Sequence, residues 1–288
     1  MTRTSMPRKV WDPRRPAARS HRPDRPAGAK GRHAARSASN SRRYSAPDPD
    51  RVLVYGWHSV KAALQNPKRR IRKLVVTENA LRRLQQSGTG LPVEPQVVPP
   101  DGFLAYVPAD AVHQGLLAEA DPLPAPAIED LKPEGIVLVL DQITDPHNVG
   151  AILRSAAAFA VNALVTTSRH SPEATGVLAK SASGALEYVP IIAITNLARG
   201  LEALKARGFL IVGLDSDADV ALSTAPLRLP LSLVLGAEGK GLRQLTRTTC
   251  DVLAKLVLPG RIQSLNVSNA AALALHIASA RLSHALPA

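Results

Sequence analysis

Short apolar runs alternate with longer amphipathic stretches over the second half of the chain. Each apolar run has the length of a buried strand, and the stretches between them carry the period of a helix. We expect strands at 136–140, 163–166, 210–214, 231–235 and 252–257, and helices at 147–159, 197–206 and 266–282. Strands that alternate with helices predict an α/β fold with a largely parallel sheet covered on both faces.

A smaller unit with shorter elements precedes this region. Its apolar pattern predicts strands at 52–55, 73–77 and 96–98, and helices at 56–64 and 79–86, and residues 115–119 close the unit. Residues 121–133 include four prolines, which predicts a semi-rigid linker. We therefore expect a basic arm at 1–50, a small α/β domain at 51–120, a linker at 121–133 and a large α/β domain at 134–288.

The first fifty residues hold almost no large aliphatic side chains, so we expect a disordered arm. Thirteen lysines and arginines against four aspartates place much of the net charge of +13 there. This predicts a polyanionic partner, and a tail that only aids solubility is the alternative. No apolar run could span a bilayer, and the prolines disfavour the amphipathic helix of an organellar transit peptide. We expect a cytoplasmic protein, with organellar targeting as the alternative.

Composition narrows the chemistry further. The single cysteine excludes an internal disulfide and a multi-cysteine zinc site, which fits a reducing compartment. The eight histidines are scattered, so we expect no metal and count this against a metal-dependent nuclease. Aromatic residues make up only 3% of the chain, so base stacking should not be its main way of binding RNA.

Three polar loops follow predicted strands, where the functional residues of parallel sheets gather. In the first, 141–154, Pro146 disfavours helix at the preceding residue, and Asn148 could cap the helix that follows. Gly150 and Arg154 are spaced i, i+4, so a guanidinium would lie beside a cleared surface and could grip a phosphate. This loop alone favours the plainer interpretation, a cap followed by a surface arginine.

The other two loops flank the last strand. Residues 236–241 (GAEGKG) follow an apolar strand, which suggests backbone in close approach to a ligand, with Glu238 as an acceptor or simply a solvated turn residue. The loop lacks the Lys-Ser/Thr of a P-loop. In the third loop, 256–269, Ser264 is the predicted N-cap of the last helix, whose exposed amides would suit an anionic group.

The order and spacing of these loops resemble the SpoU (TrmH-like) family of RNA 2′-O-ribose methyltransferases. The shared motifs are Asn-x-Gly-x-x-x-Arg at 148–154, Gly-x-Glu-Gly at 236–239 and Ser-Leu-Asn-Val-Ser at 264–268. Segments typical of the branch that methylates guanosine in bacterial 23S rRNA stand at 56–64, 111–118 and 195–204.

The resemblance implies a SPOUT-type fold, in which the end of the large domain threads a deep trefoil knot, an exception to the usual rule against knots. It implies that S-adenosyl-L-methionine is the cofactor, that two subunits form a homodimer, and that 51–120 is a ribosomal-protein-like RNA-binding domain. The residues that would bind the cofactor are Gly236, Leu256 and Leu265.

The resemblance also implies a catalytic set, which comprises Asn148, Arg154, Glu238, Ser264 and Asn266. Arg154 corresponds to the family's proposed activator of the 2′-hydroxyl. Because a free arginine stays protonated at neutral pH, we expect it to orient the ribose and its phosphate instead. Two departures from the family pattern are Val257, where a proline is common, and Asn269.

The expected function is therefore methylation of a ribose 2′-hydroxyl in RNA, with a guanosine of 23S rRNA as the target. The alternatives are a tRNA or organellar rRNA substrate, or a non-catalytic RNA-binding or ribosome-assembly protein that retains the fold. The intact motifs count against a non-catalytic protein.

Overall fold

A computed structural model describes residues 51–169 and 176–282, so the predicted arm at 1–50 lies outside the described residues. The larger of its two sheets has seven strands in the order β7-β6-β5-β10-β8-β11-β9, and every adjacent pair is parallel. The strands are β5 (Ile136–Asp141), β6 (Ala163–Thr167), β7 (Ile191–Ile194), β8 (Leu210–Leu214), β9 (Val220–Ala221), β10 (Leu231–Gly236) and β11 (Val252–Lys255). The predicted parallel sheet is confirmed.

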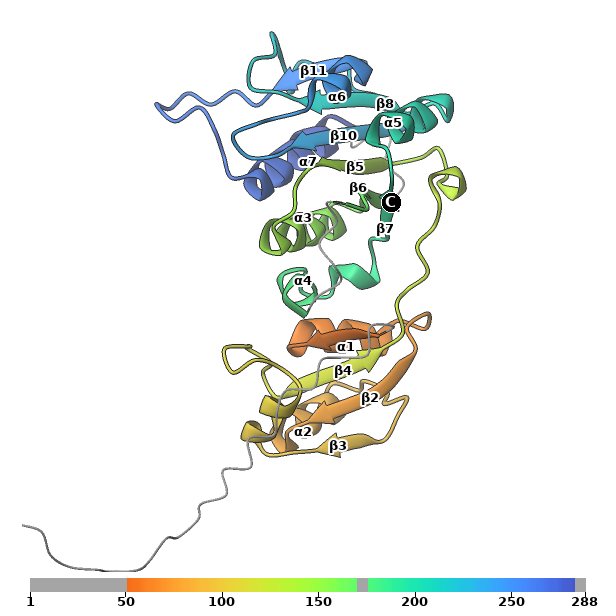
Figure 1. Cartoon of the computed structure of the whole chain (residues 1–288), viewed down its shortest axis with the longest axis vertical. Coiled ribbons are helices and arrows are strands. Elements are labelled where there is room, and N and C mark those ends of the chain that lie inside the picture. The colour runs from red at the N-terminus through yellow and green to blue at the C-terminus, as the bar shows by residue number, and fades with distance from the viewer. Residues whose placement is uncertain (1–50, 170–175, 283–288) are drawn as a thin grey trace, which may run out of the picture. The chain divides into compact units, whose positions relative to one another are not determined.

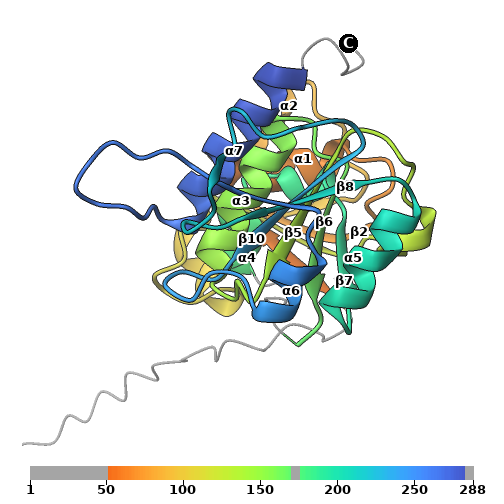
Figure 2. The ribbon, with the colours of Figure 1, turned by 90° about the horizontal axis from the view of Figure 1, so that it is seen from above.

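Helices cover both faces of this sheet, as Figure 2 shows for α3 and α7 on one side and α5 and α6 on the other. The helices are α3 (Pro146–Ala158), α4 (Gly176–Ser181), α5 (Leu197–Ala206), α6 (Gln244–Thr249) and α7 (Val267–Leu282). The side chains of β5 alternate between the two faces of the sheet and so contribute to two separate cores. Its residues Ile136, Leu138 and Leu140 join the core under α3 and α7, whereas Val137 and Val139 join the core under α5. Such an uninterrupted apolar run is typical of a strand buried on both faces.

The smaller sheet has the order β1-β4-β2-β3, with β4 antiparallel to both its neighbours and β3 parallel to β2. Its elements are β1 (Val52–Tyr55), α1 (Trp57–Gln65), β2 (Ile71–Val76), α2 (Glu78–Gln86), β3 (Pro95–Val97) and β4 (Leu116–Ala120). Each predicted element of this unit is present, and β2 begins two residues earlier than expected. No helix in the described part of the chain is long and apolar enough to cross a membrane.

The caps of two helices differ from expectation. Helix α3 begins at Pro146, and the Asp145 side chain accepts a hydrogen bond from the His147 amide at 3.0 Å. The predicted Asn148 cap is therefore wrong, because proline at the first helical position leaves the residue before it to cap. Helix α7 begins three residues after the predicted cap Ser264, and its Ser268 amide donates to Asn266 Oδ1 at 3.0 Å. Asn266 takes the capping role.

Elements that the sequence did not predict are short. They are α4, α6, β7, β9 and the 3₁₀ turns η1 (Pro100–Ala105), η2 (Ile128–Asp130) and η3 (Ala185–Glu187). Helix α4 packs against both α3 and β1, and thereby links the two sheets (Figure 1).

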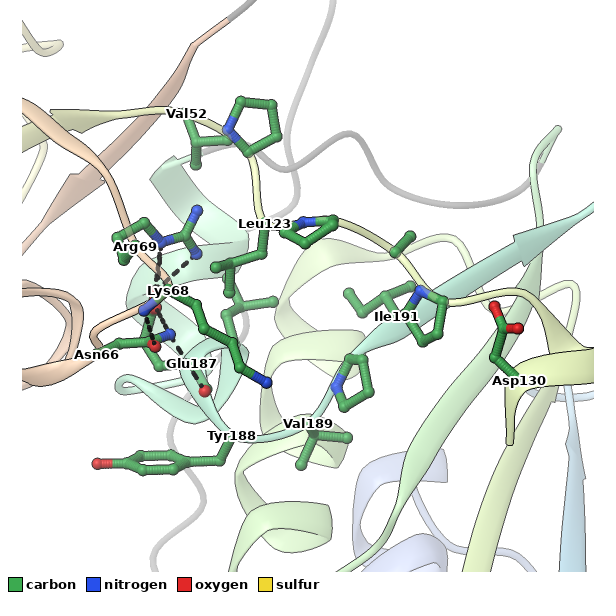
Figure 3. A pocket seen from close by; sticks show the side chains of 16 residues that line it. Val52, Asn66, Lys68, Arg69, Leu123, Asp130, Glu187, Tyr188, Val189 and Ile191 are labelled. Atoms are coloured by element: carbon green, nitrogen blue, oxygen red, sulfur yellow. Dashed lines mark hydrogen bonds and ion pairs between the residues drawn. The ribbon is translucent and has the colours of Figure 1, made fainter. Parts of the chain in front are cut away.

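A buried ion pair between Arg69 and Glu187, to which Asn66 donates a hydrogen bond, closes the same junction (Figure 3). Arg69 Nη2 lies 2.7 Å from Glu187 Oε1, and the two side chains are only 4% and 3% exposed. Asn66 donates to the other carboxylate oxygen at 2.7 Å, and Arg69 Nη1 donates to the Asp121 carbonyl at 2.9 Å. Beside this junction lies a cavity of about 620 Å³, which the proline-rich segment 122–126 borders.

Candidate functional site

A cavity of about 310 Å³ opens at the carboxyl ends of β8, β10 and β11. Four segments line this cavity, and all but 214–216 belong to or adjoin the loops 236–241 and 256–269 that the sequence singled out. The predicted cofactor residues Gly236, Leu256 and Leu265 all line the cavity, as do the predicted catalytic residues Glu238 and Ser264. Cavities of this size at strand carboxyl ends are the usual ligand sites of open α/β sheets.

The loop after β10 folds back on itself. The Gly241 amide donates to the Ala237 carbonyl at 2.8 Å, and Gly239 and Gly241 have positive φ values of 74° and 63°. A Cβ on Gly236 would lie 2.2 Å from the Gly241 carbonyl carbon and 2.4 Å from the Leu242 amide nitrogen. Gly236 therefore lets the backbone of its own loop approach closely, at Gly241 and Leu242. The folded loop forms one wall of the cavity.

Three predicted catalytic residues from separate loops meet in one hydrogen-bonded group, Asn148, Glu238 and Asn266, called here the amide–carboxylate cluster. Glu238 Oε1 accepts from Asn266 Nδ2 at 2.7 Å, from the Val267 amide at 3.0 Å and from Asn148 Nδ2 at 3.4 Å. Asn266 Nδ2 also lies 2.9 Å from Asn148 Oδ1. The cluster joins the start of α3, the loop after β10 and the start of α7, although 118 residues separate its two asparagines.

The structure does not bring Arg154 into this cluster. Arg154 is exposed on α3 and makes no hydrogen bond or ion pair with any residue in 51–169 or 176–282. It follows Asn148 by six residues, so at 3.6 residues per turn the two side chains leave the helix in different directions.

Gly150 does not provide the cleared surface that was expected beside Arg154. It is buried, and a Cβ there would lie 2.3 Å from Ser181 Cβ and 2.9 Å from the Ala182 amide nitrogen. The prediction is wrong because α4 occupies that side of α3.

Two ion pairs near the site were missed by the sequence analysis. Asp141, fully buried at the end of β5, accepts from the Arg243 amide at 3.0 Å and from Arg243 Nε at 2.7 Å. Asp215, which lines the cavity, pairs with Arg247 at 2.7 Å. A carboxylate at the end of an apolar strand was a readable signal for Asp141, whereas its partner, 102 residues away, was not.

The described residues favour neither a cysteine nucleophile nor a metal site. Burial raises the pKa of the Cys250 thiol to about 12, so this cysteine stays protonated at neutral pH and is a poor nucleophile. Among the described residues, no three histidine, cysteine or acidic side chains gather as a metal site would require. The arrangement instead offers an apolar-walled cavity beside fixed hydrogen-bonding groups, which suits binding and positioning of organic ligands.

Comparisons with known proteins agree with this geometry. Residues 135–276 match the model of the SpoU rRNA Methylase family, and residues 53–126 match the model for RNA 2′-O ribose methyltransferase substrate binding. A 23S rRNA (guanosine-2′-O-)-methyltransferase RlmB from Pseudomonas aeruginosa is 40% identical over 233 residues, which cover 77% of this chain and 93% of the relative. Its counterpart from Pseudomonas putida is 38% identical over the same lengths.

Solved structures are similar over most of the chain. A putative RNA methyltransferase of the TrmH family from Porphyromonas gingivalis is 27% identical with a TM-score of 0.68, over 81% of this chain and 90% of its own. An RNA 2′-O ribose methyltransferase is 26% identical with a TM-score of 0.66, over 81% and 89% of the two chains. The loop motifs, the parallel sheet and these matches together show that the chain belongs to the SpoU rRNA methylase family.

Proposed function

We propose that this protein transfers a methyl group from S-adenosyl-L-methionine to the ribose 2′-hydroxyl of a guanosine in 23S rRNA. The observation that carries the proposal is the meeting of Asn148, Glu238 and Asn266 beside the cavity at the carboxyl ends of β8, β10 and β11. The names of the RlmB relatives, which this chain matches over nearly their whole length, support the substrate.

The residues of the cavity fit the cofactor. Apolar walls for an adenine ring come from Leu214, Leu235, Leu256, Leu258 and Leu265, and the folded-back loop 236–241 lines the cavity beside them. Asp215 and Glu238 place carboxylates at the same cavity, which would suit the hydroxyl and ammonium groups of the ligand. When bound, S-adenosyl-L-methionine would supply a methyl group on a sulfonium: the 2′-oxygen would take the methyl carbon as its bond to sulfur breaks, S-adenosylhomocysteine would leave, and the hydroxyl proton would pass to solvent.

The protein's contribution is then mainly positioning. The amide–carboxylate cluster would hold the loop after β10 against the start of α7. The position of the cavity wall relative to the bound ribose would then stay constant. We propose that Arg154 orients the ribose and adjacent phosphate and stabilises negative charge that develops on the 2′-oxygen. Ser264, exposed at the cavity, would contribute a hydroxyl to the same neighbourhood.

Further parts of the proposal concern the whole protein. We assign RNA binding to 51–120, a linker to 121–133 and catalysis to 134–288, with 1–50 as a basic arm. The match of 53–126 to a substrate-binding family supports the first of these. We also propose a knotted chain end, a cytoplasmic location and a homodimer. The loop between β11 and α7 projects from the sheet (Figures 1 and 2), and its Val257 and Ile262 are 65% and 76% exposed, as a subunit interface would require.

The test is transfer of a labelled methyl group to in vitro transcribed 23S rRNA fragments and to tRNA, with products mapped for 2′-O-methylation. We expect a 23S fragment to be labelled, Arg154→Ala to lose at least 100-fold in rate, and Arg154→Lys to remain impaired because an ammonium lacks the guanidinium fork. Sedimentation of the same preparation should give a dimer.

Each other result has a definite meaning. Labelling of tRNA alone would keep the chemistry and overturn the rRNA assignment. Cofactor binding without transfer to either RNA or to ribosomal particles would indicate a non-catalytic RNA-binding protein. A wild-type rate for Arg154→Lys would remove the specific role of the guanidinium.

A further inference from the structure

Another cavity, of about 260 Å³, lies at the carboxyl ends of β6 and β7, on the same edge of the sheet as the candidate site. It is called here the basic pocket. Among the described residues, its lining includes two arginines, three threonines and one asparagine, and no acidic side chain: Arg169, Arg243, Thr167, Thr195, Thr246 and Asn196. None of these residues belongs to the cavity assigned to the cofactor.

Arg243 is held in a fixed orientation. Its Nε donates to Asp141, which is fully buried, and its backbone amide donates to the other oxygen of the same carboxylate. The two Nη groups make no hydrogen bond within the described residues, and the side chain remains 42% exposed. A guanidinium oriented through Nε with both Nη groups available suits bidentate contact with a phosphate at little entropic cost.

Two further residues favour a polar ligand in the basic pocket. Thr246 is 2% exposed and lines the pocket with its polar side chain. Arg169 is exposed at the pocket and forms no ion pair with any residue in 51–169 or 176–282. Leu245, 63% exposed on the rim, adds an apolar surface of the kind a ribose or base would contact.

The chain connects the basic pocket to the candidate site. The segment 236–243 carries Glu238 of the amide–carboxylate cluster near one end and Arg243 at the other, and Asp141, which anchors Arg243, begins the loop that leads to Asn148. We propose that the basic pocket binds a backbone phosphate of the RNA substrate, on a nucleotide flanking the one that is methylated. The inference rests on the proposed action on RNA and adds a subsite to it.

The test compares Arg169→Glu with Arg228→Glu, which makes the same charge change on an exposed arginine beside the amino end of β10. We expect Arg169→Glu to raise KM or Kd for the RNA about tenfold more than Arg228→Glu does. The slope of log K against log salt should fall by about 1, as expected for one lost phosphate contact. Cofactor affinity and the melting temperature should be unchanged, and Arg169→Lys should restore most of the affinity.

Equal effects of the two charge reversals would overturn the proposal. Inorganic phosphate provides a second arm: a rise in melting temperature at low millimolar phosphate that Arg169→Glu abolishes, with RNA affinity unaffected, would assign the pocket to a free anion instead. RNA binding is measured directly by filter retention, so the inference is tested even if the wild type transfers no methyl group. Failure of methylation with intact, Arg169-dependent RNA binding would count against the proposed function alone.

Discussion

Glu238 illustrates how one side chain can hold a site together. It is exposed, yet one of its oxygens accepts two short hydrogen bonds, from Asn266 Nδ2 and from the Val267 amide. The second of these satisfies an amide in the first turn of α7, which would otherwise lack an intrahelical partner. A negative charge at this helix start is also favoured by the helix dipole. Glu238 therefore acts both as a loop anchor and as a second cap for α7.

Asn266 offers a test of that arrangement. Asn266→Asp should keep the cap on the Ser268 amide but place a second carboxylate within about 3 Å of Glu238. Repulsion raises the pKa of one of the two carboxyls in the folded state above its unfolded value. A raised acid pKa means that stability is lost as pH rises through it. We expect a loss on the order of 1–2 kcal/mol at pH 8 that shrinks at pH 5, measured by urea unfolding.

Asn266→Ser is the matched control, because serine caps helices without adding charge. Its loss of stability should be the same at both pH values. A pH-independent loss in Asn266→Asp as well would show that Glu238 and residue 266 do not interact in solution.

At the scale of secondary-structure elements, the helices that the sequence failed to predict were the shortest ones. The sixteen-residue α7 and the six-residue apolar strands β5 and β10 carry enough periodic positions to be recognised. The six-residue helices α4 and α6 do not complete two turns, so their periodicity was unreadable. Missing α4 also led to the wrong interpretation of Gly150, since a glycine's role depends on what packs against it.

The contact between α3 and α4 can be tested through that glycine. Gly150→Ala would place a methyl group 2.3 Å from Ser181 Cβ, with backbone just behind it, so α4 must move. Overpacking of this kind costs about 1–3 kcal/mol, although alanine is the better helix former. We expect a lower midpoint in urea for Gly150→Ala. Gly260→Ala, where a Cβ meets nothing within 4 Å, should change the midpoint little. A higher midpoint for Gly150→Ala would mean that α4 can move away from the added methyl group without a loss of stability.

At the scale of the whole molecule, the site residues were easier to predict than what joins the two sheets. Asn148, Glu238 and Asn266 stand in short motifs that a reader of the sequence can recognise, and each motif follows a strand. Arg69 and Glu187 stand in no motif, and 118 residues separate them. Their pairing depends on how α4 and η3 meet the small sheet, which no local pattern encodes.

The junction between the sheets carries the last prediction. Glu187→Gln removes the carboxylate that compensates Arg69 in a site where both side chains are almost fully buried. Leaving one buried charge unpaired costs about 3–5 kcal/mol. Because the pair joins the two sheets, we expect this loss of free energy to weaken the cooperativity between their unfolding transitions.

In a Trp11→Phe background, the remaining tryptophan, Trp57 on α1, reports the small sheet unit alone. The fluorescence transition in urea should then precede the circular dichroism transition, whereas the parent protein should show one midpoint for both. Asp121→Asn, which breaks the exposed pair with Arg72, should change the stability little and leave the transitions coincident. Coincident transitions in Glu187→Gln would show that α4 packing alone couples the sheets.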